Sequence, residues 1–136
     1  MTDHLRRAIE VFAKAPFVTD LGIEVADVGE GWVETRVEIS SRLRQQHGFA
    51  HAGVVATLAD HTAGAAASTV IHDDKSVLTA NYTIHLLRPG SDEVLTCRGD
   101  VVRAGRTLIV TQADVWADGK LCARYTGTMT VVDRAL

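Results

Sequence analysis

Positive charge is not in excess in this sequence, and this excludes nucleic acid as a partner. The 136 residues include 14 Lys and Arg against 17 Asp and Glu, which gives a formal net charge of −3. Its basic residues form no cluster larger than a pair in the sequence, such as Arg103 and Arg106. Binding to a phosphate backbone requires a basic face, which this composition does not supply. The composition still allows a small anionic ligand, because its binding needs only a few arginines.

We expect neither a secretory leader nor a membrane span. Residues 1–16 contain no apolar stretch of the kind found in signal peptides. The longest apolar stretch, residues 52–71, is rich in Ala and Gly rather than Leu and Ile, and it carries Asp60 and His61 at its centre. Both residues would be costly in lipid. We therefore expect a buried helix here, no membrane partner and a cytoplasmic protein.

Cysteine is scarce, and its placement argues against a metal centre. Cys97 and Cys122 fall in strand-like segments without metal-ligand spacing, and no histidine pair follows them to complete a zinc site. We predict no metal site. The cysteines are interpreted as buried thiols in a reducing compartment, with a disulfide as the open alternative.

With 46% apolar and 23% charged residues, the sequence has the composition of an ordinary globular protein. No linker, repeat or low-complexity tract divides the chain, so we expect one domain over residues 1–136. Its first 20 residues form an N-terminal helical segment, because apolar residues recur there at helical spacing and Thr2 or Asp3 can cap the start: Leu5, Ala8, Ile9 and Phe12.

Hydrophobic periodicity predicts the remaining elements. Residues 32–40 alternate between apolar and polar side chains, as in a half-buried strand. Asp118-Gly119 is a strong hairpin sequence. Residues 41–50 are a polar loop, and residues 51–70 form a long apolar helix. The other predicted strands are 22–28, 75–88, 93–103, 107–117 and 121–132.

These elements predict an α+β fold with a helix at its centre. The last four strands follow one another through hairpins, so they form an antiparallel sheet with one face to be covered. Only the long helix is apolar all round, and the sheet must therefore wrap around it. A single sheet leaves such a helix partly uncovered, which favours self-association.

Asp60 in this apolar helix requires an explanation. An ionised carboxylate is costly in an apolar setting unless it is paired or protonated. One explanation is structural, with a buried Ser or Thr donating to the carboxylate. The other is chemical, with Asp60 in an active site. His61 points about 100° away from Asp60 on a helix and is interpreted as structural.

The start of the same helix is a candidate anion site. First-turn N–H groups lack partners within a helix and attract negative charge. Ala50, Ala52 and Gly53 are small, so a ligand carbonyl can approach the backbone there. Asp60 lies nine residues after His51, about 13 Å along the axis. One helix cannot bring both to the same atom, whereas two antiparallel helices across a dimer interface can.

Several of these residues together resemble a known family. The pattern formed by Gln45, His51, Gly53, Leu58 and Asp60, followed by TANYTIHLLRPG at 79–90, resembles hotdog-fold acyl-CoA thioesterases of the phenylacetate-degradation (PaaI-like) group. The resemblance runs from about residue 22 to 132. Family members have Asn or Gln six residues before a His-Gly-Gly, and Asp or Glu nine residues after the His. Here Ala52 replaces the first Gly of that motif.

The resemblance implies a role for each site residue. Backbone N–H groups of Ala52 and Gly53 would polarise the thioester carbonyl, with Gln45 positioning the thioester or water and His51 a positioning residue. Asp60 of a neighbouring subunit would be general base or nucleophile. Thr79 would orient the water. The candidates for the coenzyme phosphates, each equally consistent with plain surface charge, are Arg88, Arg103 and Arg106.

The resemblance further implies the substrate class and the assembly. A medium-chain or aryl acyl-CoA would be hydrolysed by a dimer or tetramer, with coenzyme A as part of the substrate and no cofactor. One alternative is a non-catalytic acyl-CoA-binding domain, although about 20 residues before the first strand are too few for an effector domain. Another is an acyl-thioester hydratase or dehydratase, whose catalytic-His pattern is not found.

Overall fold

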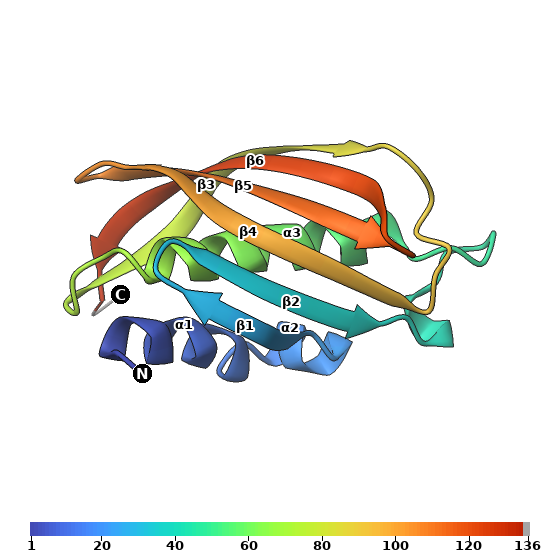
Figure 1. Cartoon of the computed structure of the whole chain (residues 1–136), viewed down its shortest axis with the longest axis horizontal. Coiled ribbons are helices and arrows are strands. Elements are labelled where there is room, and N and C mark those ends of the chain that lie inside the picture. The colour runs from blue at the N-terminus through green and yellow to red at the C-terminus, as the bar shows by residue number, and fades with distance from the viewer. Residues whose placement is uncertain (135–136) are drawn as a thin grey trace.

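A six-stranded antiparallel sheet curls around one long helix, α3, in the computed structural model, which describes residues 1–134 (Figure 1). The strand order is β1-β2-β4-β5-β6-β3. The elements are α1 (Asp3–Ala13), α2 (Pro16–Leu21), β1 (Glu24–Gly29), β2 (Trp32–Glu38), the short 3-10 helix η1 (Ser41–Leu43), α3 (Ala52–Ser68), β3 (Lys75–Leu86), β4 (Val94–Ala104), β5 (Leu108–Ala117) and β6 (Lys120–Asp133). The wrapped helix predicted from the sequence is confirmed.

Helix α3 is the core of the molecule. Leu58, Ala59 and Ala63 have no exposed surface, and the sheet lies directly against them. Small residues allow this close approach: a Cβ added at Gly99 of β4 would lie 3.0 Å from the Thr62 carbonyl oxygen. Although α3 is apolar, no helix within residues 1–134 combines the length and hydropathy needed to cross a membrane.

The N-terminal segment packs on the open side of this core. The Thr2 side chain accepts a hydrogen bond from the Leu5 N–H and so caps α1, as predicted. Helix α1 packs against α3 and β1, with Ala8 and Phe12 buried. Pro16 then begins a second short helix, α2, which the sequence pattern did not separate from the first.

The pairing of β3 differs from the sequence prediction. We expected a hairpin between β3 and β4, but β3 pairs with β6 at the edge of the sheet, while β4 pairs with β2 and β5. The connecting segment 87–93 is long enough to cross the end of the sheet. It is held there by bonds from Ala50 N–H to the Gly90 carbonyl and from Leu87 N–H to the Cys122 carbonyl. The hairpin expected at Asp118-Gly119 is confirmed.

Strand β3 has one side without a pairing strand. It is twelve residues long, and its exposed apolar side chains include Leu78, Tyr82 and Leu86. The neighbouring surface of α3 is a stripe of small or polar residues that the sheet does not bury: Gly53, Thr57, Asp60 and Gly64. The helix is therefore partly uncovered, as expected, and its uncovered stripe lies beside the free strand edge.

Both cysteines are buried and unpaired in the structure. Desolvation raises the pKa of the Cys97 thiol to about 12, and burial also raises the pKa of Cys122. Neither thiol is ionised near neutral pH, so neither acts as a nucleophile there.

Candidate active site

The start of α3 presents fixed hydrogen-bond donors. His51 caps the helix, and its Nδ1 accepts a hydrogen bond of 2.9 Å from the Gly53 N–H. The neutral ring then carries its proton on Nε2, which becomes a donor. The Gly53 N–H, expected as an oxyanion donor, is thus already bonded. The Ala52 N–H has no partner among the described residues.

Gln45 is oriented by its own loop. Its side-chain oxygen accepts hydrogen bonds from the N–H groups of His47, at 2.6 Å, and Phe49, at 3.2 Å. Gly48 has a φ of +87°, a left-handed conformation that glycine adopts without strain, and it turns the chain back toward Gln45. The Gln45 amide NH₂ group is left without a partner within residues 1–134, so it is a second donor held in place.

These donors share one pocket. Gln45, His51, Ala52 and Arg88 line it, together with apolar and backbone groups of Phe49, Ala50, Val55, Leu86, Leu87, Pro89, Gly90 and Cys122. Four of the predicted site residues therefore come together at the N-terminal end of α3. Arg103 and Arg106 do not, because they lie at the β4–β5 turn, at the opposite end of the sheet.

Asp60 is held by two hydroxyl groups. Thr79 of β3 donates to Oδ1 of Asp60 at 3.0 Å, and Tyr125 of β6 donates to the same oxygen at 2.5 Å. The Thr79 hydroxyl also lies 3.2 Å from the Met129 sulfur, a weaker acceptor. Burial and the neighbouring carboxylate raise the pKa of Tyr125 well above its usual range, so it is a neutral donor.

Sequence reasoning found Thr79 but missed Tyr125. Tyr125 sits 65 positions from Asp60 and belongs to no local motif. It does occupy an inward position in β6, whose side chains alternate between buried and more exposed: Ala123, Tyr125, Gly127 and Met129 are buried. A buried tyrosine hydroxyl needs a hydrogen-bond partner, and this was the clue the sequence offered.

A β-bulge in β3 aims two side chains at this site. The register with β6 shifts between Thr79 and Asn81. Thr79 lies opposite Met129 and Tyr82 opposite Gly127, both inward positions of β6. Residues three apart share a face of a strand only across such an irregularity.

The cavity beside Asp60 extends away from the start of α3. His61, Gly64, Leu78 and Met129 are among its walls. His61 Nε2 donates to the Val11 carbonyl at 3.0 Å, and burial lowers its pKa. His61 therefore joins α1 to α3 as a neutral ring, in keeping with its predicted structural role.

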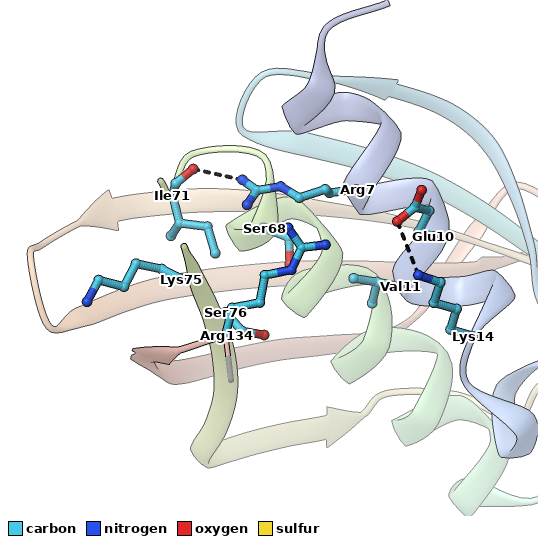
Figure 2. Close-up of a pocket in the computed structure, with 9 residues that line it drawn as sticks. All are labelled: Arg7, Glu10, Val11, Lys14, Ser68, Ile71, Lys75, Ser76 and Arg134. Atoms are coloured by element: carbon cyan, nitrogen blue, oxygen red, sulfur yellow. Dashed lines mark hydrogen bonds and ion pairs between the residues drawn. The ribbon is translucent and has the colours of Figure 1, made fainter. Parts of the chain in front are cut away.

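A second pocket adjoins this cavity, since Val11, Ser68 and Ser76 line both. Figure 2 shows its cations engaged in structural contacts: Arg7 binds the Ile71 carbonyl and Lys14 pairs with Glu10. Lys75, on its rim, is 2.7 Å from Asp133. The pocket therefore adds room beyond Asp60 more than it adds positive charge.

The candidate site thus consists of two separate halves in one chain. The donors at the start of α3 lie about 13 Å along the helix axis from the carboxylate. Within residues 1–134, no cluster of three or more His, Cys, Asp or Glu side chains is arranged to hold a metal ion. The chemistry available is therefore polarisation of a carbonyl in one half and proton transfer or nucleophilic attack in the other.

Comparison with known proteins assigns the family. Residues 47–123, more than half of the chain, match the thioesterase superfamily. This chain belongs to that superfamily. A thioesterase family protein from Silicibacter pomeroyi superposes on this superfamily member with a TM-score of 0.90 at 33% identity, over 94% of this chain and 97% of the other. The fold of this chain is therefore the hotdog fold predicted from the sequence.

Two further relatives of this thioesterase-superfamily protein are informative. A phenylacetic acid degradation-related protein from Ralstonia eutropha shares the fold, with a TM-score of 0.80 at 23% identity over 89% of this chain and 96% of that one. A 1,4-dihydroxy-2-naphthoyl-CoA hydrolase from Listeria monocytogenes is 24% identical over 95 residues, which are 70% of this chain and 77% of that protein. The chain is a hydrolase of the thioesterase superfamily.

Proposed function

We propose that this protein hydrolyses an acyl-CoA thioester to the free acid and coenzyme A, in an active site shared by two copies of the chain. The observation that carries the proposal is the pair of half-sites on α3. Donors converge at its start, and a carboxylate held by two neutral hydroxyls lies at its middle. The similarity to a protein named as an acyl-CoA hydrolase supports the coenzyme A ester as substrate.

A second copy of the chain completes the site. The free edge of β3 can pair with the same edge of a partner, which would also cover Leu78, Tyr82 and Leu86. The uncovered stripes of two α3 helices would then run antiparallel. Thr57 lies about midway between Gly53 and Asp60, so a two-fold axis near it sets Asp60 of one copy opposite Gly53 of the other.

The reaction follows from the groups in each half. The Ala52 N–H, the Nε2–H of His51 and the Gln45 amide are candidate donors to the thioester oxygen, which gains negative charge when the carbonyl is attacked. Asp60 acts either as the base that takes a proton from water or as the nucleophile. When Asp60 is the base, water adds to the carbonyl carbon, the C–S bond breaks, and the coenzyme A thiolate takes up the proton that Asp60 removed. When Asp60 is the nucleophile, its oxygen adds to the carbonyl carbon and the C–S bond breaks to give a mixed anhydride and the coenzyme A thiolate. Water then hydrolyses the anhydride, which releases the free acid and regenerates Asp60.

The rest of the substrate has room in both directions. Arg88 lines the pocket of the donors and is a candidate contact for a coenzyme phosphate. Arg103 and Arg106 lie at the far end of their own sheet, so they could reach this coenzyme only from the partner. The cavity between Asp60 and the pocket of Figure 2 would take a medium-chain or aryl acyl group, as in the PaaI-like thioesterases.

The test is thiol release from a panel of acyl-CoA esters of different chain length and aryl content. Hydrolysis of one class is expected, while binding of the esters without thiol release would favour the non-catalytic binding domain. Formation or loss of an enoyl double bond would favour the hydratase or dehydratase.

The shared site is tested by mixing two inactive variants, Asp60→Asn and Gln45→Ala. Hybrid dimers contain one site with both halves intact, so part of the activity should return after subunit exchange. Sedimentation measures whether the protein is a dimer or a tetramer, and a fully active monomer would overturn the shared site.

A further inference from the structure

We propose that Tyr125 is a positioning residue that works with Thr79 to hold Oδ1 of Asp60 and leaves Oδ2 as the reacting oxygen. The inference rests on the proposed thioesterase function and deepens it, since it assigns different tasks to the two oxygens of one carboxylate. The family resemblance did not point to Tyr125.

The hydrogen bonds of Asp60 are one-sided. The Tyr125 and Thr79 hydroxyls both donate to Oδ1, at 2.5 and 3.0 Å. Oδ2 has no hydrogen-bond partner among the described residues. The two hydroxyls therefore hold one oxygen of the carboxylate in place and leave the other free to take a proton or to attack. Here the unsatisfied oxygen belongs to a residue that lines a cavity.

The tyrosine itself is held rigidly. Its side chain has no exposed surface, and its ring stacks on Tyr82 of β3 with centroids 5.2 Å apart. The ring lies along β6 over Gly127, where an added Cβ would be 2.2 Å from the Tyr125 hydroxyl oxygen. A glycine at this position is therefore needed for the hydroxyl to reach Asp60.

Neutral donors suit a carboxylate that must act as a base or nucleophile. Within residues 1–134, no Arg or Lys forms an ion pair with Asp60. The titratable groups around it are Tyr125 from β6, Tyr82 behind that ring from β3, and His61 on its own helix, which is turned toward Val11 of α1. Two hydroxyls fix the orientation of the carboxylate without neutralising its charge.

The first test is Tyr125→Phe, which removes one hydroxyl and keeps the ring. A hydrogen bond to a charged group has a net strength that corresponds to about a 10-fold change in an equilibrium or rate. We expect kcat to fall about 10-fold or more, with KM nearly unchanged. Thr79→Val should act in the same direction.

The matched control is Thr35→Val. Thr35 is also buried, and its hydroxyl bonds the Thr62 hydroxyl at 2.7 Å on a part of α3 turned toward β2. This variant should lose stability while its kcat and KM stay as in the wild type. In an Asp60→Asn background, Tyr125→Phe should cause no further loss of rate.

A substrate-independent measurement separates this inference from the proposed function. The side-chain carboxyl carbon of Asp60, assigned by comparison with Asp60→Asn, is observed by NMR at one fixed pH in wild type, Tyr125→Phe and Thr35→Val. We expect its chemical shift to change in Tyr125→Phe, which removes a hydrogen bond to Oδ1, and to stay as in the wild type in Thr35→Val. If the chemical shift and kcat of Tyr125→Phe both match the wild type and only stability falls, Tyr125 is structural and the inference is wrong. If the chemical shift changes but no acyl-CoA is hydrolysed by the wild type, the proposed function fails and the positioning of Asp60 stands.

Discussion

The two halves of the candidate site are built by different kinds of contact. At the start of α3, the side chains of Gln45 and His51 are held by neighbours in the chain: Gln45 accepts from the N–H groups of His47 and Phe49, and His51 accepts from the Gly53 N–H. At the middle of α3, Asp60 is held by hydroxyls from β3 and β6, 19 and 65 positions away. The first half is therefore a local loop structure, whereas the second exists only when the sheet has closed around the helix.

Asp60→Asn should have the largest effect on activity and the smallest cost in stability. The Asn side chain keeps an oxygen that accepts from both hydroxyls but can no longer take a proton or attack a carbonyl. Hydrolysis should fall at least about 100-fold, the lower end of the contribution from a positioned acid–base group. The melting temperature should stay equal or rise, as is common when a functional charge is removed. Retained hydrolysis with lost stability would make Asp60 a structural residue.

Gln45→Glu tests the local half. The glutamate keeps an oxygen for the His47 and Phe49 N–H groups and loses the amide donor. If that donor stabilises the developing oxyanion, turnover should fall by about 100-fold. Gln45→Ala also removes the loop contacts and should add a loss of about 1 kcal/mol in unfolding free energy. Equal turnover in Gln45→Glu and wild type would assign polarisation of the thioester to the backbone alone.

Gly127→Ala tests the long-range half from a residue that contacts no ligand. The added Cβ would overlap the Tyr125 hydroxyl, so either the ring or β6 must move. Overpacking of this kind should lower the unfolding free energy by about 1–3 kcal/mol and lower kcat with it.

Gly29→Ala is the matched control, because an added Cβ there would lie 2.3 Å from the Trp32 ring nitrogen, on β1 at the opposite edge of the sheet from β3. It should lower the unfolding free energy by a similar amount without lowering kcat. Urea unfolding and thiol release on both variants provide the measurement. Equal stability of Gly127→Ala and wild type would contradict the tight fit of Tyr125.

The smallest expected effect is a pH dependence of stability from His61. Burial lowers its pKa in the folded state, so the unfolded chain binds this proton more readily. The stability contributed by the neutral ring is present above the unfolded value near 6.5 and is lost as the pH falls through the lower folded value. His61→Gln, which keeps a donor for the Val11 carbonyl, should lose less stability between pH 7.5 and pH 5. If wild type and His61→Gln lose the same stability between pH 7.5 and pH 5, the titrating group is another residue.

Local structure was largely predictable from the sequence. The apolar stretch after His51, the alternation of Val33, Thr35 and Val37 and the Asp118-Gly119 turn each act within a few residues, and each formed the expected element. Such features depend on backbone preferences and side-chain periodicity, which a sequence displays directly. The family resemblance, rather than periodicity, implied a common site for Gln45 and His51 and a place for Thr79 beside Asp60; the first two residues line one pocket, and Thr79 donates to Asp60.

Other features depended on the closed sheet. The side-chain alternation of β3 and β4 is as compatible with a hairpin between them as with the observed pairing of β3 and β6. Only the competition of all six strands for partners directs β3 to β6. That pairing brings Tyr125 under Tyr82 and onto Asp60. The sequence by itself determined the elements and the start of α3, because those contacts are short in sequence. The environment of the carboxylate was decided by the tertiary structure, because a hydroxyl 65 positions away reaches Asp60 only after the sheet has wrapped the helix.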